Sequence, residues 1–115
     1  MQIPAKDPRR HLPLRPSAFA VLAALADGPL PGIDVLDAVN ATVPGSPLLG
    51  PGTLYRLLRE LRHEQLIGRV ETGAADERQA HHELTALGRA VLRAEAARLR
   101  RTLDLADGRS RGGLH

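Results

Sequence analysis

The sequence has no cysteine and no tryptophan, and Phe19 and Tyr55 are its only phenylalanine and tyrosine. Without cysteine the chain can form no disulfide and no thiolate metal site, and it has no cysteine nucleophile. With so few aromatic rings, the core must consist of Leu, Val, Ile and Ala. Such a core suits small packed helices, and it leaves little from which to build a deep aromatic ligand pocket. It also gains stability when further surface is buried in an oligomer.

Long apolar runs and a strong charge imbalance are missing too. No stretch reaches the roughly 20 apolar residues of a membrane span and no hydrophobic signal region begins the chain, so we expect a cytoplasmic protein without a membrane partner. The net charge is +3, and Lys6 is the only lysine among the 16 basic residues. This balance attracts phosphate backbones without specificity, but many unrelated Arg-rich proteins share it. A chain of 115 residues is expected to form one domain.

Residues 51–68 carry the clearest helical pattern. Pro51 suits the first position of a helix, and Gly68 is typical of residues shortly beyond a helix end. Apolar residues recur at the spacing of one helix face: Leu54, Leu57, Leu58 and Leu61. The opposite face is small at one end and basic along its length: Gly52, Arg56, Arg59 and His63. The pattern predicts a helix that packs through leucine and offers arginine to an anionic partner, and the alternative is an ordinary solvated face.

The segments before residue 51 predict an arm and two shorter helices. Residues 1–16 mix basic residues with prolines that argue against a helix, so we expect a flexible basic arm that either touches a phosphate backbone or is a disordered tail. Ser17 suits an N-cap and opens a helix to about Ala26, with inward residues Phe19, Leu22, Ala23 and Leu25. A second helix runs from Pro31 or Gly32 to about Val43, with inward residues Ile33, Leu36, Val39 and Val43. A turn at 44–47 follows, and Leu48 and Leu49 are expected to anchor it.

After Gly68 the period changes from that of a helix to that of a strand. Residues 69–72 alternate, 73–76 read as a turn, and 78–84 can return as a partner strand, which predicts a two-stranded hairpin. Thr85 then caps a helix to about Ala106 that has two apolar stripes. The first stripe can meet the core of this chain: Leu87, Val91 and Ala94. The second predicts contact with the same helix of another copy: Leu92, Ala96, Leu99, Leu103 and Ala106.

This order of elements is the plan of a winged helix-turn-helix domain. We therefore predict a mainly α fold of the α+β type, with a DNA-binding domain at 17–84 that includes a two-stranded wing. A dimerisation helix at 85–106 and a disordered tail at 107–115 complete the chain. A helix fits the major groove of DNA, where each base pair presents a distinct set of donors and acceptors. A dimer would set two such helices on successive grooves, about 34–36 Å apart.

Three motifs resemble the PadR-like family of transcriptional regulators. The first is Gly52-Thr53-Leu54-Tyr55, followed by Leu58, Leu61 and Leu66-Ile67. The others are Asp76-Glu77-Arg78 in the wing and Leu84-Thr85-x-x-Gly88 at the start of the last helix. Together they cover about residues 15–105, and the chain is similar to the short members that end after a single C-terminal helix. The resemblance implies a cytoplasmic homodimeric repressor that binds a pseudo-palindromic operator and is released by a small molecule or a stress signal.

The chain also departs from the family pattern. Pro31-Gly32-Ile33 stands where the family commonly has His-Gly-Tyr, and Gln79-Ala80 and His81-His82 replace its consecutive basic residues and paired aromatics. Only Arg78 stays basic among the usual wing contacts, so we expect a weaker grip of the wing on phosphate. Because the last helix has no aromatic residue, binding of flat aromatic drugs between aromatic side chains, known in some short members, is not expected here.

The predicted DNA-binding residues are Gly52, Thr53, Tyr55, Arg56, Arg59, Arg62, His63 and Arg78. Arginine forks match guanine O6 and N7 or phosphate oxygens, and groups at the start of a helix meet phosphates. Arg62 lies nearer the leucine face than the other two arginines. As alternatives, Arg59 pairs within the helix with Glu60 or His63, and Tyr55 fills space between helices.

No pattern predicts an enzyme, a cofactor or a metal site. His81 and His82 are adjacent on a strand and point to opposite faces, so we favour a packing role for the pair over metal or pH sensing. The acidic pairs Asp34 with Asp37 and Glu60 with Glu64 have no companion nucleophile or base and read as solvated helix faces. The alternative function, from another class, is a winged-helix protein-interaction module that does not read DNA specifically.

Overall fold

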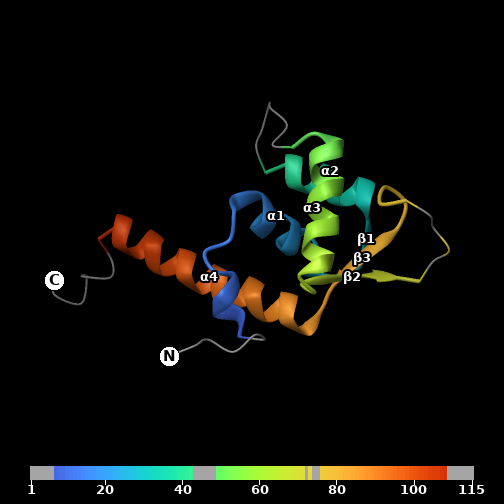
Figure 1. Cartoon of the computed structure of the whole chain (residues 1–115). Helices are drawn as coiled ribbons and strands as arrows, with labels where there is room; N and C mark the ends of the chain where they lie inside the picture. The colour runs from blue at the N-terminus through green and yellow to red at the C-terminus, as the bar shows by residue number, and fades with distance from the viewer. Residues whose placement is uncertain (1–6, 43–48, 72, 74–75, 109–115) are drawn as a thin grey trace.

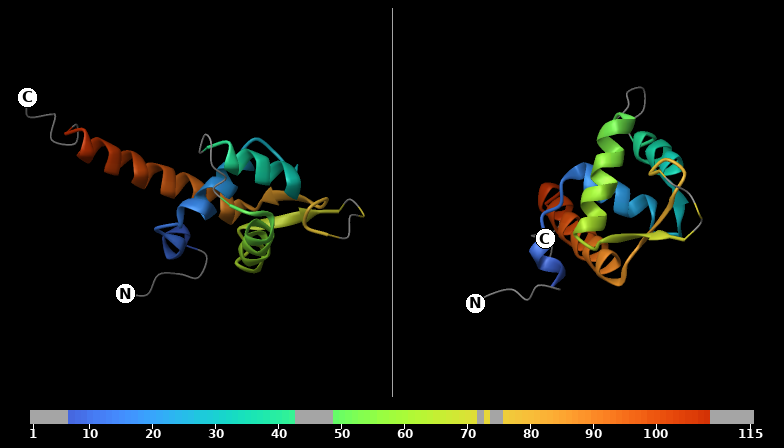
Figure 2. Two further views of the ribbon diagram at one scale, coloured as in Figure 1. Left: turned by 90° about the horizontal axis from the view of Figure 1, so that it is seen from above. Right: turned by 45° about the vertical axis from the view of Figure 1, so that its right-hand side comes forward.

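The computed structural model describes residues 7–42, 49–71, 73 and 76–108. The elements in chain order are η1 (Pro8–His11), α1 (Pro16–Ala24), β1 (Leu30–Pro31), α2 (Gly32–Asn40), α3 (Pro51–His63), β2 (Ile67–Val70), β3 (His81–Leu84) and α4 (Ala86–Ala106). The first three α-helices and the sheet form one body, and the C-terminal half of α4 extends away from it (Figures 1 and 2). The predicted mainly α winged-helix fold is confirmed.

The core lies where α3 meets the other helices. Its four leucines are all buried, as predicted, and they pack with residues of α1, α2 and α4 in one apolar cluster. Removing each leucine side chain from water is worth about 1.5–3 kcal/mol, so this stripe fixes which face of α3 turns inward.

The inward faces of α1 and α2 were predicted less well. Helix α1 begins at Pro16, with Arg15 in the N-cap position, so Ser17 is not the cap. Ala23 is exposed, whereas Ala18 and Val21 are buried. The reason is that α1 is apolar nearly all round, so its periodicity does not single out one face. In α2 the buried residues are Gly32, Val35, Leu36 and Val39.

The loop from α2 to α3 is anchored at its far end. Val43, Leu48 and the predicted turn at 44–47 lie outside the described residues. Leu49 packs against the core, as predicted, and its backbone is held by the Asn40 side chain, whose Oδ1 accepts from Leu49 N at 2.8 Å and whose Nδ2 donates to Leu49 O at 3.0 Å. This contact sets the start of α3 next to the end of α2.

Within the described residues the sheet has three strands rather than the predicted two. The antiparallel order is β1-β3-β2, with Leu30 opposite His82 and Arg69 opposite His82 on the other side. Strand β1 was missed because two residues show no alternation. Strand β2 begins at Ile67 rather than at Arg69, because Gln65, at φ 65°, takes the left-handed turn that ends α3. Gly68 therefore lies within the strand and does not stop the helix.

The described part of the N-terminal segment lies along α4. Pro8–His11 form a single 3-10 turn, so the prediction that prolines exclude helix there is wrong. Leu14 N donates to the buried Glu95 carboxylate of α4 at 2.7 Å. An ion pair joins Arg15 of the same segment to Glu60 of α3 at 3.1 Å. His11 Nδ1 of this segment lies 3.4 Å from Oε2 of Glu64, just past the end of α3.

Helix α4 starts at the predicted cap. Thr85 Oγ1 accepts from Gly88 N at 2.9 Å and donates to Gln65 O at 2.6 Å, which ties α4 to the end of α3. Val91 is buried and Leu87 packs against the core, as predicted for the first stripe. Glu95, on the same helix, is also buried, which its sequence position does not indicate.

Candidate nucleic-acid interface

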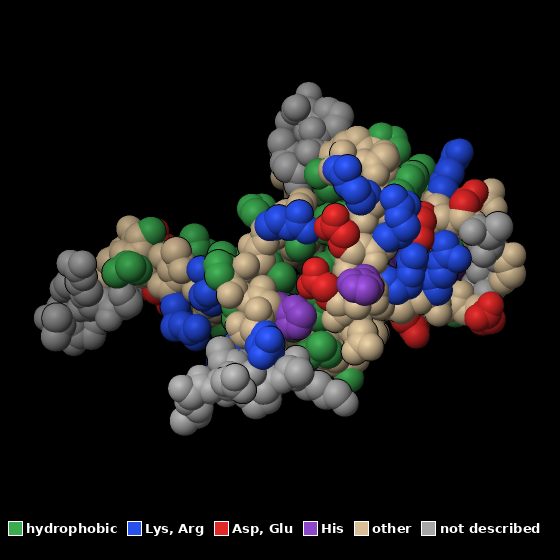
Figure 3. Space-filling view, in the orientation of Figure 1, with side chains coloured by type: hydrophobic (Ala, Val, Ile, Leu, Met, Phe, Trp, Pro, Cys, Tyr) green, Lys and Arg blue, Asp and Glu red, His purple; other side chains and the backbone are tan. Residues whose placement is uncertain are grey.

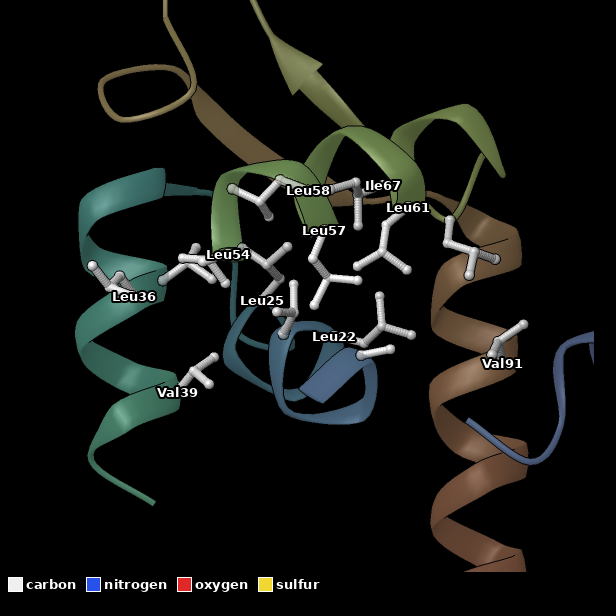
Figure 4. Packing of buried hydrophobic residues seen from close by; sticks show 14 residues of the cluster. Leu22, Leu25, Leu36, Val39, Leu54, Leu57, Leu58, Leu61, Ile67 and Val91 are labelled. Carbon is white, nitrogen blue, oxygen red and sulfur yellow. The ribbon is translucent and has the colours of Figure 1, made fainter. Parts of the chain in front are cut away.

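One face of α3 is open to solvent and basic. The residues predicted to face outward are all exposed: Gly52, Arg56, Arg59 and His63. Thr53, at the start of the helix, is exposed too. In Figure 3, arginine side chains gather over α3 and over the neighbouring wing. The opposite side of the helix points its leucines at Leu22 and Leu25, between α2 and α4 (Figure 4). The helix cannot turn without exposing those leucines, so its arginines are held outward.

Arg56 and Arg59 are free to bind a ligand. Neither guanidinium makes an ion pair or hydrogen bond within the described residues. Glu60, the predicted helix partner of Arg59, pairs instead with Arg15 at 3.1 Å. The alternative in which Arg59 is satisfied within α3 is therefore not what the structure shows.

The first turn of α3 leaves its backbone accessible. Gly50 occupies the N-cap position and no side chain of the described residues caps the helix, so the amide groups there keep their hydrogen-bonding capacity. A Cβ added to Gly52 would meet nothing within 4 Å, and packing therefore does not explain a glycine at this position. Tyr55 is half-buried and packs against the core, as its space-filling alternative predicts.

Arg62 differs from the other two arginines of α3. Its Nη1 and Nη2 donate to the two carboxylate oxygens of Glu77, at 3.0 and 2.7 Å, and its side chain is 30% exposed. Arg69 Nη2 donates to Glu77 Oε1 at 3.2 Å. Because Arg62 sits near the leucine edge of α3, its fork turns toward the wing. The structure thus places this predicted DNA-binding residue in an ion pair within the chain.

Glu77 and His82 form the buried polar centre of the wing. Burial acts to raise the pKa of Glu77, but the hydrogen bonds and charge of Arg62, with the charge of Arg69, outweigh it and hold that pKa below its ordinary value. His82 is fully buried, which confirms its predicted packing role, and its Nε2 lies 3.1 Å from Glu77 O. Since a carbonyl only accepts, Nε2 carries the proton and Nδ1 has no partner among the described residues. Sequence reasoning missed the role of Glu77, for which the only signal was its place in the wing motif.

The wing and α3 enclose a shallow hollow. It has a volume of about 450 Å³ and its lining includes Arg59, Arg69 and Arg78. Arg78 is exposed, as a phosphate-binding residue must be. Within the part of the chain that the structure describes, no group of three or more His, Asp or Glu residues is placed to hold a metal ion.

A comparison with models of known protein families identifies the family of the chain. The profile of the transcriptional regulator PadR-like family matches residues 21–94, which include α3, the wing and the first part of α4. The chain belongs to the PadR-like family. This family is one of transcriptional regulators and not of enzymes, in agreement with the prediction from the sequence. None of the described helices is long and apolar enough to span a membrane.

One curated relative and several solved structures share parts of this PadR-like chain. It is 42% identical over 78 residues to an uncharacterized 37.1 kDa protein in transposon TN4556 of Streptomyces fradiae, covering 66% of this chain but only 21% of that protein. Its fold resembles a PadR family regulator from Clostridium difficile R20291, with a TM-score of 0.67 and 18% identity over 80% of this chain and 95% of the other.

Two further structures share the fold. The hsRosR-S4 complex gives a TM-score of 0.68 at 17% identity, covering 95% of this chain and 100% of the other. BpsR of Bordetella bronchiseptica, whose DNA binding is regulated by 6-hydroxynicotinic acid, gives a TM-score of 0.60 at 23% identity, over 82% of this chain and 64% of the other. At these identities the likeness concerns the fold alone.

Proposed function

We propose that this PadR-like protein is a DNA-binding transcriptional repressor that reads a pseudo-palindromic operator through α3. The observation that carries the proposal is the exposure of Arg56 and Arg59, which have no ion-pair partner among the described residues, on a helix whose other face is buried. Guanidinium forks donate in the geometry that guanine O6 and N7, or phosphate oxygens, accept. Gly52 and Thr53 at the uncapped start of α3 are suited to a backbone phosphate, and His63 and Arg78 extend the same surface.

The proposed repressor is a homodimer held by α4. Beyond the body of the protein, Leu103 of this helix is a large apolar side chain that is 61% exposed. In the predicted dimer stripe, Leu92 packs partly against the core of its own chain, Ala96 and Leu99 are half-buried, and Leu103 and Ala106 are exposed. Pairing of two such helices would bury this surface and set two copies of α3 about 34–36 Å apart, the spacing of successive major grooves.

A small-molecule effector is part of the proposal. An apolar hollow of about 560 Å³ lies between α1 and α2, with Phe19, Ala20 and Ala23 in its lining. Its volume is within the range of small-ligand pockets, and its lining would suit an apolar molecule. The structurally similar BpsR responds to 6-hydroxynicotinic acid, which is a precedent in this fold.

Footprinting on the DNA upstream of the protein's own gene tests this function. We expect two protected patches one helical turn apart, and affinity that falls steeply with salt. Protection no stronger than on unrelated DNA of equal length would contradict the proposal and would favour the alternative, a winged-helix interaction module.

A further inference from the structure

The buried carboxylate of Glu77 pairs with arginines from two elements, α3 and β2. Its side chain is 10% exposed, and it accepts hydrogen bonds from Arg62 of α3 and Arg69 of β2. The His82 ring lies 3.5 Å from the same carboxylate. A bidentate Arg–carboxylate pair has a fixed geometry, so this contact defines where the wing stands relative to α3.

The backbone around Glu77 is fixed as tightly as its side chain. Gly32 N and Ile33 N, at the start of α2, donate to Ala80 O at 3.1 Å and to Arg78 O at 3.0 Å. A Cβ on Gly32 would lie 2.0 Å from Glu77 O, so this approach needs glycine. The segment from Asp76 to Ala80 is thus bound to α2, α3 and the sheet while the Arg78 side chain stays exposed.

The same carboxylate decides which arginines a phosphate can reach. Arg59, Arg69 and Arg78 line one hollow with Glu77, and Arg62 reaches the carboxylate from α3. Non-specific affinity for DNA rises with the number of phosphates that basic side chains neutralise. With Glu77 in place, two of the four guanidinium groups are occupied, and those of Arg59 and Arg78 remain for DNA.

We propose that Glu77 is a positioning and specificity-determining residue that fixes the wing against α3 and withholds Arg62 and Arg69 from phosphate. The proposal rests on the DNA-binding function inferred above. It assigns Arg62 a role that acts through Glu77 rather than through a contact with DNA. Within the wing motif Asp76-Glu77-Arg78, Glu77 then binds Arg62 and Arg69 inside the protein, and Arg78 faces solvent.

The first test compares Glu77→Gln with Glu83→Gln. Both variants remove one negative charge from the wing, but Glu83 is exposed and makes no ion pair within the described residues. Binding of an unrelated 30-base-pair duplex is measured across salt concentrations. We expect the salt slope of Glu77→Gln to steepen by about 0.9 for each arginine released, and that of Glu83→Gln to match the wild type. The ratio of affinities for the upstream DNA and the unrelated duplex should fall for Glu77→Gln and should stay at the wild-type value for Glu83→Gln.

The second test keeps the proposal open to refutation if Glu77→Gln does not fold. Arg62→Gln should leave the slope on the unrelated duplex unchanged, whereas Arg59→Gln should lower it by about 0.9. A slope lowered equally by both variants would show that Arg62 binds phosphate and would overturn the proposal. So would a folded Glu77→Gln whose slope equals that of Glu83→Gln.

A heparin column separates this inference from the proposed function. Heparin is a polyanion without base sequence, so Glu77→Gln should elute at higher salt than Glu83→Gln even if the wild type shows no preference for its upstream DNA. A wild type without preference for its upstream DNA would refute the repressor proposal. Later elution of Glu77→Gln would still support the withholding of Arg62 and Arg69 by Glu77. Equal elution of the two variants would refute the charge-withholding role alone.

Discussion

Gly88 of α4 lies so close to Leu66 that a Cβ on the glycine would stand 1.8 Å from the Leu66 carbonyl oxygen. That carbonyl also accepts from Thr85 N at 3.1 Å, so it cannot move without breaking the start of α4. The Leu-Thr-x-x-Gly motif is therefore a packing device that joins the end of α3 to α4.

Gly88→Ala should accordingly lower the free energy of unfolding by about 1–3 kcal/mol or more, as overpacking of a tight contact does. Gly52→Ala is the matched control, because it is also a helical glycine but its Cβ would meet nothing within 4 Å. It should stabilise the protein by up to about 1 kcal/mol through helix propensity. Urea unfolding followed by circular dichroism measures both, and equal effects would contradict the packing role of Gly88.

Glu95 links the N-terminal segment to α4. Its hydrogen bonds with Arg98, together with the bond from Leu14 N, hold the pKa of Glu95 below its ordinary value in spite of burial. Glu95→Ala leaves the Leu14 amide without its acceptor and should cost about 1.5–3 kcal/mol of unfolding free energy. Amide hydrogen exchange should also quicken at residues 8–14. Exchange there at the wild-type rate would show that the segment does not depend on Glu95.

Stability should fall as the pH drops below about 6.5, the ordinary pKa of histidine. Burial lowers the pKa of His82, and the charges of Arg62 and Arg69 lower it further, while Glu77 acts to raise it. Between the folded and the unfolded pKa, the unfolded chain therefore binds a proton at His82 that the folded chain does not bind. The stability that His82 contributes is complete above the unfolded pKa and is lost as pH falls from there toward the folded pKa. One such group gives a slope of at most about 1.4 kcal/mol per pH unit.

Unfolding of His82→Phe across pH 5–7 checks this assignment. Phenylalanine keeps a flat ring but cannot titrate, so the slope should flatten, whereas His63→Gln, which changes an exposed residue of α3, should retain it. A slope that survives in His82→Phe would assign the pH dependence to another group. Glu77 and Glu95, whose pKa values are lowered, lose their contribution only at more acid pH, below about 4.5.

The proposed dimer depends on the exposed apolar end of α4. Leu103→Glu would place a charge in the buried seam of two such helices, which costs several kcal/mol if no partner meets it. Sedimentation should therefore show a monomer, while Arg101→Glu, on the opposite side of the same helix, should remain dimeric. A wild-type monomer at micromolar concentration, or a dimeric Leu103→Glu, would contradict this interface.

Apolar periodicity predicted the parts of the fold that face the core. The leucine stripe of α3 and the Thr85 cap were both found, because each follows from local spacing. The ion pair of Arg62 with Glu77 was missed, because periodicity reports which side faces solvent and not which polar groups meet across a sheet and a helix. Glu95 was missed for the same reason, since a carboxylate on α4 is compatible with burial only once Arg98 and Leu14 are seen beside it.

For the binding site too, the sequence predicted which side chains face solvent but not which polar groups pair with one another. The exposure of Arg56 and Arg59 follows from the leucine pattern, which sets the opposite face of a regular helix. The position of Arg62 does not follow, because a residue at the edge of the stripe can turn either way and its partner lies 15 residues further along. Strand β1 was beyond prediction, since a strand of two residues exists only through its pairing with β3.

The most direct measurement is the affinity of Arg56→Ala/Arg59→Ala for the upstream DNA, followed by fluorescence anisotropy at fixed salt. Arg93→Ala/Arg101→Ala is the control, because it removes the same charge from exposed positions of α4. We predict that the α3 variant stays folded and binds the upstream DNA no better than an unrelated duplex, while the control keeps its preference. If the α3 variant discriminates the two DNAs as well as the wild type does, α3 is not the surface that reads DNA.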